Sequence, residues 1–350
     1  VQVAALQVLE VVKARNYLRD YERLLRSPHW QVRVLAVDLL VMAEHQGIVK
    51  LVLPLLDDPE RRVRVTAIQA LSAAGGDAVV DPLIKALGRN EGRVLDDLAD
   101  ALARITGKDF GLNTVQWESW WSTNKGQVKI ARIPAREYGK LKEAKEQAVT
   151  QVGSYFGLRV ISKHVAFVFD CSESMLEAYV PPGLKPPEEP EEKAEPGKSK
   201  AAGPKKKRAA KAPRGDITTR IEVAKRELQQ VLGKLPAGVM LNILRFNTFV
   251  ESCKPALTEL KDPARKEFTD FVRASNPEGL TNLYGALEEA LKDDKVDTIY
   301  LLSDGAPTVG TFIETQAVLA EVARLNQLPK VKINTIGFHM KPEEAAFMQE

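Results

Sequence analysis

The sequence has few of the residues that define several common classes of protein. Only two of its 350 residues are cysteines, Cys171 and Cys253, and no C-x-x-C pair occurs, so neither a disulfide framework nor a cysteine-rich zinc site is expected. No apolar run approaches the roughly 20 residues that span a bilayer. The net charge is only +3, from 50 Lys and Arg against 47 Asp and Glu. Such a balance does not by itself point to nucleic acid or a membrane as the partner.

The first hundred residues contain an internal repeat, which determines the expected fold. The apolar pattern recurs every 31 residues, and extended backwards it reaches Val1, so the chain is expected to open inside a repeat of a longer protein. The first twelve residues also lack a basic leader and a cleavage-like site, so no secretory signal is recognised and no compartment is assigned. The positions that show the repeat are Val32, Val63 and Val94, and likewise Leu40, Leu71 and Leu102.

Each repeat has the pattern of a helical hairpin. Apolar residues from Val32 to Leu40 follow the i, i+3, i+4, i+7, i+8 spacing of one helix face. A second apolar run ends before Pro59, with Asp58 as the expected N-cap of the next helix. One hairpin cannot bury its apolar face alone, so the units are expected to stack into an α-solenoid. Residues 1–111 resemble HEAT-like repeats, which commonly serve as scaffolds for binding other proteins.

A tryptophan-rich segment, residues 112–124, follows the repeats. Three tryptophans lie at i, i+3 and i+4, on one face of a short helix with Asn113 or Thr114 as its N-cap. An aromatic cluster can be a ligand platform, but here it more simply closes the apolar end of the solenoid. Residues 125–154 are charged and mixed, and we interpret them as a connector. The tryptophans are Trp117, Trp120 and Trp121.

The pattern changes in residues 155–350, where short apolar runs alternate with helical stretches. Such alternation is typical of a doubly wound α/β domain, with a parallel sheet covered by helices on both faces. Residues 248–254 follow the preceding strand too closely for a crossover, so we expect an antiparallel edge strand there. The chain stops before an expected closing helix and strand. The predicted parallel strands are 165–169, 239–246, 298–302 and 331–336.

An insertion at residues 177–216 interrupts the first crossover. It holds eight prolines, an acidic half and a basic half, and almost no large apolar residue, so it is expected to be disordered. Its basic run, residues 205–208, is similar to a nuclear address or a phosphate-binding patch. A solvated loop whose opposite charges compensate one another is the simpler interpretation.

Oxygen-bearing side chains follow two of the predicted strands and precede one helix. In a doubly wound sheet ligands bind beyond the carboxyl ends of the strands, so these groups should share one edge. Carboxylates and hydroxyls suit a hard cation such as Mg²⁺ and do not suit zinc or copper. The five candidate ligands are Asp170, Ser172, Ser174, Thr281 and Asp304.

This split pattern resembles the metal-ion-dependent adhesion site (MIDAS) of von Willebrand factor type A (vWA) domains, over residues 162–350. The resemblance implies a Rossmann-like fold that binds Mg²⁺ or Mn²⁺. It implies that Ser172 and Ser174 are direct ligands, that Thr281 is direct or water-mediated, and that Asp170 and Asp304 act mostly through water. A Glu or Asp of a partner protein commonly completes the coordination. Glu173 departs from the pattern, because many members have Gly there.

Other interpretations of the same residues are weaker. Asp and Ser after a strand can simply cap the following segment. Aspartyl-phosphate phosphatases usually need a second acid where Ser172 stands, and no Cys–His–acid arrangement is recognisable around Cys171. Neither a P-loop nor a dinucleotide-binding glycine motif occurs, so no enzymatic activity is expected.

The sequence therefore predicts an adaptor that binds an acidic protein partner through a metal, with a second partner possible on the HEAT-like surface. One alternative is RNA binding, because Ro-type proteins join helical repeats to a vWA domain; the mixed charges on these helices make RNA the weaker expectation. Another alternative is an accessory subunit of an ATP-driven complex such as a metal chelatase.

Overall fold

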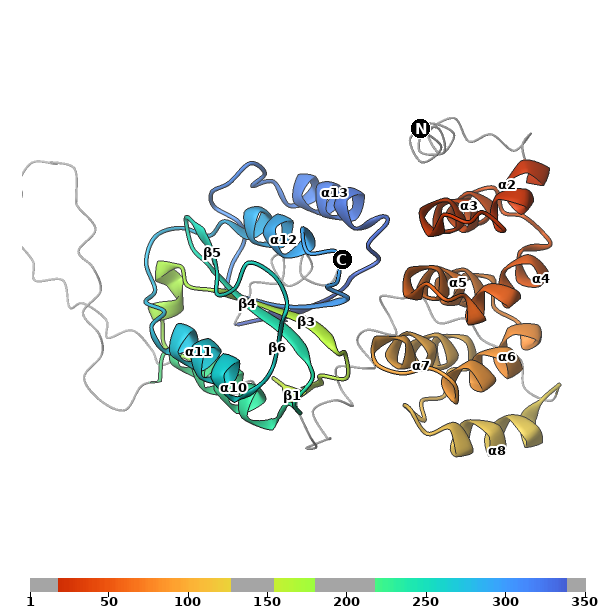
Figure 1. The fold of residues 1–350 in the computed structure, drawn as a ribbon, viewed down its shortest axis with the longest axis horizontal. Helices are drawn as coiled ribbons and strands as arrows, with labels where there is room; N and C mark the ends of the chain where they lie inside the picture. The colour runs from red at the N-terminus through yellow and green to blue at the C-terminus, as the bar shows by residue number, and fades with distance from the viewer. Residues whose placement is uncertain (1–17, 127–153, 180–217, 339–350) are drawn as a thin grey trace, which may run out of the picture.

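The computed structural model describes residues 18–126, 154–179 and 218–338, which form two parts (Figure 1). We call residues 18–126 the helical block and the described residues from 154 to 338 the α/β domain. Most of the predicted connector, most of the predicted insertion, the first part of the repeat register and the last residues of the chain lie outside the described residues.

The helical block consists of two layers of short helices, of which α3, α5 and α7 form the layer nearer to the α/β domain (Figure 1). None of the described helices has the length and apolar character needed to cross a membrane. The elements are α2 (Leu18–Leu24), α3 (Trp30–Met42), α4 (Ile48–Val52), the 3₁₀ helix η2 (Leu53–Asp57), α5 (Arg61–Ala74), α6 (Asp77–Leu87), α7 (Arg93–Thr106) and α8 (Thr114–Asn124).

The 31-residue period places equivalent side chains in the core. Val32, Val63 and Val94 are at most 2% exposed, and the three leucines that repeat with them are fully buried. They belong to one apolar cluster that runs through all the repeats. Stacking therefore buries a face that a single hairpin would leave in water, as the period predicts.

An arginine that recurs in two of the repeats bonds to the main chain just before its own helix. The Arg33 guanidinium donates to the Ser27 carbonyl at 2.8 Å, and Arg64, 31 residues later, donates to the Asp58 carbonyl at 2.6 Å. Asp58 is not the N-cap predicted for α5, because its carboxylate forms a two-pronged ion pair with Arg33. The N-cap is Glu60, whose side chain accepts a hydrogen bond from the second residue of the helix.

Helix α8 packs its tryptophans onto the end of the helical block. Its N-cap is Asn113, whose side chain accepts a hydrogen bond from the Gln116 amide. Trp117 and Trp121 are at most 3% exposed and belong to the same core as the repeats. The Trp117 indole donates to the Gly111 carbonyl at 2.9 Å. These rings are therefore packed into the core and do not form an open platform.

The α/β domain has a sheet of six strands in the order β5-β4-β3-β7-β8, with β6 also pairing with β4. Strands β4, β3, β7 and β8 are parallel, while β5 and β6 pair antiparallel with β4. The elements are β1 (Ser154–Tyr155), β2 (Leu158–Arg159), β3 (His164–Asp170), the 3₁₀ helix η3 (Glu173–Leu176), α10 (Arg220–Lys234), β4 (Met240–Phe246), β5 (Val250–Ser252), β6 (Thr258–Glu259), α11 (Asp262–Arg273), α12 (Leu283–Leu291), β7 (Thr298–Ser303), α13 (Thr315–Asn326) and β8 (Lys332–Gly337).

Helices cover both faces of this sheet, so the predicted doubly wound arrangement is confirmed. Phe167 and Phe169 of β3 pack with α10 and α11, whereas Ala166 and Val168 pack with α12 and α13 on the other face. This alternation explains why the strand is apolar throughout. The predicted antiparallel edge strand is β5, while the β1–β2 hairpin and β6 have no counterpart among the predicted elements.

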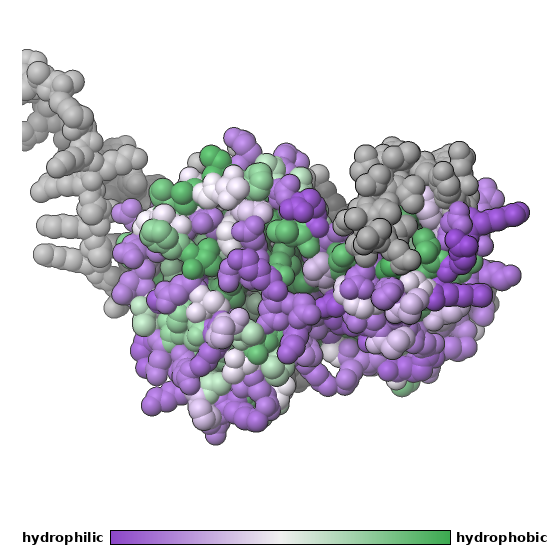
Figure 2. Space-filling model, turned by 45° about the horizontal axis from the view of Figure 1, so that its top comes forward, coloured by the Kyte–Doolittle hydropathy of each residue, from purple (hydrophilic) through white to green (hydrophobic). Residues whose placement is uncertain are grey.

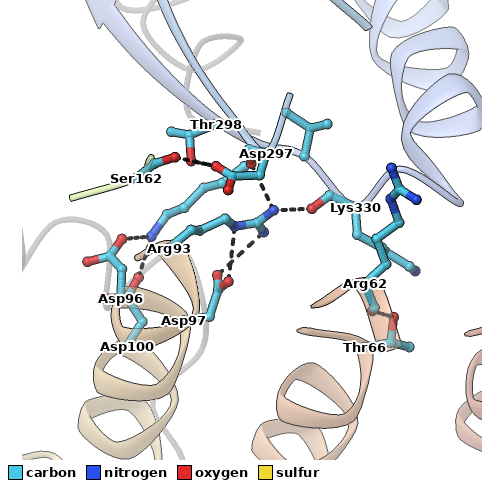
Figure 3. A network of polar contacts seen from close by, with 12 residues as sticks. Arg62, Thr66, Arg93, Asp96, Asp97, Asp100, Ser162, Asp297, Thr298 and Lys330 are labelled. Atoms are coloured by element: carbon cyan, nitrogen blue, oxygen red, sulfur yellow. Dashed lines mark hydrogen bonds and ion pairs between the residues drawn. The ribbon is translucent and has the colours of Figure 1, made fainter. Parts of the chain in front are cut away.

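The helical block contacts the amino ends of the sheet strands, where polar residues precede β3, β7 and β8. Buried Arg93 donates to the Asp297 carbonyl at 2.9 Å and also to the Lys330 carbonyl (Figure 3). Lys332 pairs with both Asp96 and Asp100, the latter at 2.9 Å. In Figure 2 hydrophilic side chains line this junction.

The contact residues of the helical block follow the repeat. Arg62 and Arg93 are 31 residues apart, and both donate to main-chain carbonyls of the α/β domain. On α7, Arg93, Asp96 and Asp100 lie at i, i+3 and i+7, which places them on one helix face. The same spacing that builds the core thus also aligns a polar stripe toward the second domain.

Candidate metal centre at the carboxyl edge of the sheet

Two neighbouring parallel strands end in acidic residues at the edge of the sheet opposite the helical block. Asp170 is the last residue of β3, and Asp304 directly follows the last residue of β7. The two strands are paired in register, so their carboxyl ends lie side by side. Both carboxylates are buried, at 0% and 6% residue exposure. After β3 the chain adds strands first on one side (β4) and then on the other (β7), and this switch in strand order is where doubly wound folds bind ligands.

The loop after β3 joins the two strand ends through hydrogen bonds. Asp170 accepts a hydrogen bond from the Ser172 amide at 2.8 Å, and the Ser172 and Ser174 hydroxyls are 3.0 Å apart. The Ser174 hydroxyl then donates to Asp304 at 2.8 Å. Four of the five predicted ligands are thus linked in one polar chain. Ser303 closes it from the other side, because its hydroxyl donates to Asp170 at 2.6 Å.

Thr281 reaches the same edge through its main chain. The Glu173 amide donates to the Gly279 carbonyl at 3.1 Å, and the Glu278 amide donates to the Cys171 carbonyl at 2.9 Å. The 278–281 segment therefore lies against the serine loop. Thr281 is 5% exposed and precedes Asn282, the N-cap of α12. The Thr281 amide donates to the Thr308 hydroxyl at 2.9 Å. Thr281 therefore lies beside the polar chain formed by Asp170, the two serines and Asp304.

A glycine allows the 278–281 segment to approach so closely. Gly279 has φ of +72°, a left-handed conformation that side chains other than glycine rarely adopt. A Cβ atom at this position would lie 2.6 Å from the Thr248 hydroxyl, which itself accepts a hydrogen bond from the Leu280 amide. The turn after β4, which carries Thr248, and the 278–281 segment are therefore held in a fixed position relative to each other.

The electrostatics of the edge favour a bound cation. The pKa of Asp170 is raised to about 6, mainly because the carboxyl is buried and also because the Asp304 charge lies nearby. Hydrogen bonds from Ser172 and Ser303 lower this pKa, but they only partly offset the burial. A cation between the two carboxylates would remove that penalty. Burial also raises the pKa of the adjacent Cys171 thiol to about 12, so a thiolate nucleophile is not favoured there.

The side chains at this edge fit a hard divalent cation. In an octahedron with bonds of about 2.1 Å, neighbouring ligands lie about 3.0 Å apart. The Ser172 and Ser174 hydroxyls have this separation. Among the residues that the structure describes, no group of three or more His, Cys, Asp or Glu could hold a metal ion. A site here must consequently use hydroxyl ligands together with its two carboxylates.

Three further residues of this edge were not among the predicted ligands. Ser303 directly follows the predicted strand 298–302 in the sequence and is the last residue of β7 in the structure. Arg220 donates to the second oxygen of Asp304 at 2.8 Å and pairs with Glu177 at 2.7 Å. No local pattern indicates this arginine, because it reaches the edge only after the chain has passed through the insertion. The main chain brings it there, since the Arg220 amide donates to the Glu177 carbonyl at 3.0 Å.

Comparisons with known proteins support the two parts separately. Residues 21–103 match the family model for HEAT repeats. A curated relative, von Willebrand factor A domain-containing protein 3A of Homo sapiens, is 30% identical over 104 residues. That match covers 30% of this chain and 8% of the human protein, so the chain spans only a small part of its relative.

Similar solved structures include a von Willebrand factor type A protein from Catenulispora acidiphila, at 16% identity and a TM-score of 0.32, covering 53% of this chain and 40% of that one. Proximal thread matrix protein 1 of the mussel byssus, with a zinc-occupied MIDAS motif, gives 14% identity and a TM-score of 0.30, covering 50% of this chain and 37% of that one. At these values the likenesses carry no argument about function.

The class of protein follows from the fold, the repeat match and the curated relative taken together. The chain has HEAT repeats at residues 21–103, followed by a vWA-like domain with a mostly parallel sheet. A domain of this kind suggests interaction with other proteins.

Proposed function

We propose that this protein binds an acidic segment of a partner protein through a divalent cation at the carboxyl edge of its sheet, without catalysing a reaction. Ser172 and Ser174 would hold Mg²⁺ or Mn²⁺ directly, Thr281 would act directly or through water, and Asp170 and Asp304 would act mostly through water. The cation would supply a positive centre for a carboxylate of the partner. The observation that carries the proposal is the continuous polar chain from Asp170 through both serines to Asp304.

Exposed apolar side chains around the edge support a protein as the partner. Seven large apolar residues are exposed among those that the structure describes, and four of them lie in the loops of this edge. Isolated exposed apolar residues are ordinary, but their concentration beside a polar centre is typical of a binding surface. The four are Leu176 at 50%, Phe249 at 77%, Leu280 at 51% and Ile313 at 49% exposure.

These loops are held together by the main chain and by Thr248. Leu176 ends the 3₁₀ helix that contains Ser174, and Leu280 precedes Thr281. The turn that carries Phe249 joins them, because the Leu280 amide donates to the Thr248 hydroxyl at 3.0 Å. A partner carboxylate at the metal would therefore be flanked by apolar contacts.

The charges of the helical block weigh against the RNA alternative. The face of α3 and α7 that lies toward the α/β domain carries Asp38, Asp96 and Asp100, which pair with lysines of that domain. This face is covered by the α/β domain and its arginines donate to carbonyls there, so it does not present the basic surface that binds a phosphate backbone. The ATP-driven alternative has no specific observation in its favour among the described residues.

Metal binding is tested by thermal unfolding of the full chain with Mg²⁺, Mn²⁺ or chelator. A cation at about 100 times its Kd stabilises the native state by about 2.7 kcal/mol, which corresponds to a rise of roughly 5–10 °C in Tm for a domain of this size. We expect this rise in the wild type and its loss in Ser172→Ala. Ser252→Ala, which removes a hydroxyl from β5 of the same sheet, should keep the rise.

The proposal is wrong if neither cation changes the Tm of the wild type, or if Ser172→Ala responds as the wild type does. The RNA alternative would be favoured if the affinity for RNA fell steeply with salt while chelator left the Tm of the protein unchanged.

A further inference from the structure

The candidate metal centre already has a fixed positive charge beside it. The Arg220 guanidinium donates to Asp304 at 2.8 Å, on the carboxylate oxygen that does not accept the Ser174 hydroxyl. The side chain of Asp304 is fully buried and that of Arg220 is 12% exposed, so water screens this pair only weakly. One aspartate therefore bridges a predicted metal ligand and an arginine.

With this arginine in place, the net charge of the site changes from negative to positive when a divalent cation binds. Asp170, Asp304 and Arg220 together carry −1 when both carboxyls are ionised, and a divalent cation raises the total to +1. Without the arginine, the two carboxylates and the cation cancel. Glu177, the other partner of Arg220, is 64% exposed, so its charge is largely screened by solvent. Glu173 is also exposed.

The contacts also make Arg220 a fixed part of the centre. It is the first residue of α10, which begins with a capping box formed by Thr219 and Glu222. Its amide is held by the Glu177 carbonyl, and both terminal nitrogens of its guanidinium are engaged. A charge held at both ends keeps its position whether or not a ligand is bound.

We infer that Arg220 has opposite effects on two affinities of the centre. It weakens binding of the divalent cation, and it strengthens binding of the partner carboxylate to the site that holds the cation. The inference rests on the proposed function. Its physical basis is that one positive charge repels the cation and attracts the anion. A structural role alone would affect both in the same direction.

The test measures both affinities on the full chain with Mn²⁺ as the metal and acetate as the carboxylate probe. Free Mn²⁺ is followed by electron paramagnetic resonance. Acetate binding is followed by the water-proton relaxation of protein-bound Mn²⁺, with acetate replacing chloride at constant ionic strength. The variants are Arg220→Gln, which removes the charge, and Arg220→Lys, which retains it. Arg273→Gln removes an equal charge from an exposed pair on α11 and serves as the matched control.

We expect Arg220→Gln to bind Mn²⁺ about 3- to 30-fold more tightly and acetate more weakly by a similar factor, the range expected for one charge at partial screening. Arg220→Lys should lie between it and the wild type, and Arg273→Gln should match the wild type. The inference is overturned if Arg220→Gln weakens both affinities or changes neither. If the wild type binds no Mn²⁺, the proposed function itself fails. If the wild type binds Mn²⁺ and acetate but Arg220→Gln does not change the two affinities in opposite directions, only the inference about Arg220 fails.

Discussion

The junction between the two parts of the chain predicts that a single lysine of the α/β domain stabilises the helical block. Lys332 begins β8 and lies between Asp96 and Asp100 of α7. Burial lowers the pKa of this lysine, but the three aspartates of α7 outweigh burial and raise it well above its ordinary value. Its ammonium is therefore charged, and Lys332→Ala would remove the cation that lies between Asp96 and Asp100.

The expected loss is about 2–3 kcal/mol. Exposed ion pairs contribute up to about 1 kcal/mol, and removing one partner of a fully buried pair costs about 3–5 kcal/mol. The Lys332 side chain is 20% exposed and its two partners are 23% and 24% exposed, which places the contact between these limits. With a slope of about 2 kcal/mol per M, the urea midpoint should fall by roughly 1 M.

Tryptophan fluorescence measures this effect on the helical block alone. All four tryptophans of the sequence lie in that block, whereas Lys332 lies in the other domain. A shift in the urea curve seen by tryptophan would thus report coupling across the junction. The tryptophans are Trp30, Trp117, Trp120 and Trp121.

Two comparisons make the experiment decisive. Lys292→Ala removes an exposed ion pair at the C-terminal end of α12 in the same domain and should leave the tryptophan curve unchanged. Lys332→Ala should cost much less in a background of Asp96→Asn and Asp100→Asn, because interacting residues give a coupling energy of about 0.5–3 kcal/mol. If Lys332→Ala and Lys292→Ala give the same curve, the junction does not stabilise the helical block and the reasoning is refuted.

Two further predictions follow from single positions. Gly279→Ala should destabilise the protein by about 1–3 kcal/mol and weaken Mn²⁺ binding, because its Cβ would meet Thr248 in a left-handed conformation; Gly305→Ala, where a Cβ meets nothing within 4 Å, should do neither in the same titration. Burial raises the pKa of Asp97 despite nearby cations, so its ionised form costs stability as pH rises through the folded-state pKa. The free energy of unfolding of the wild type relative to Asp97→Asn should therefore fall as the pH rises above about 4, the ordinary pKa of an aspartate, and a constant difference across urea curves at several pH values would contradict this.

Periodic features of the fold were predictable from the sequence because they rest on local spacing. The 31-residue repeat gave the stacked hairpins, and the apolar runs gave the parallel strands at nearly their observed bounds. The short strands β1, β2 and β6 escaped prediction, because segments of two residues have no period and form only where a partner strand lies nearby. The wrong N-cap at Asp58 has a similar cause, since a distant arginine competes for that carboxylate.

The candidate site was predictable only where its residues follow strands. Asp170 and Asp304 could be placed at one edge, because parallel strands share the direction of their carboxyl ends. Arg220 could not, since its place depends on how the chain returns from the insertion. The Tyr179 amide donates to the Thr218 carbonyl at 2.8 Å, and this closure next to the insertion fixes where α10 begins. The contact of Arg220 with Asp304 depends on this loop closure, and no local spacing of residues in the sequence predicts it.

The two edges of the sheet limit how a partner can approach. β7 has six residues and so spans about 20 Å, with Asp297 at the junction before it and Asp304 at the candidate site after it. A segment bound at the metal would therefore lie on the opposite side of the α/β domain from the helical block, which stands beside that domain in Figure 1 and contacts the amino ends of its strands. The face of α3, α5 and α7 is engaged with the α/β domain, so a second partner on the HEAT repeats would have to use the outer helices. One partner that contacts both surfaces would need to extend around the α/β domain, which a small folded domain could not do.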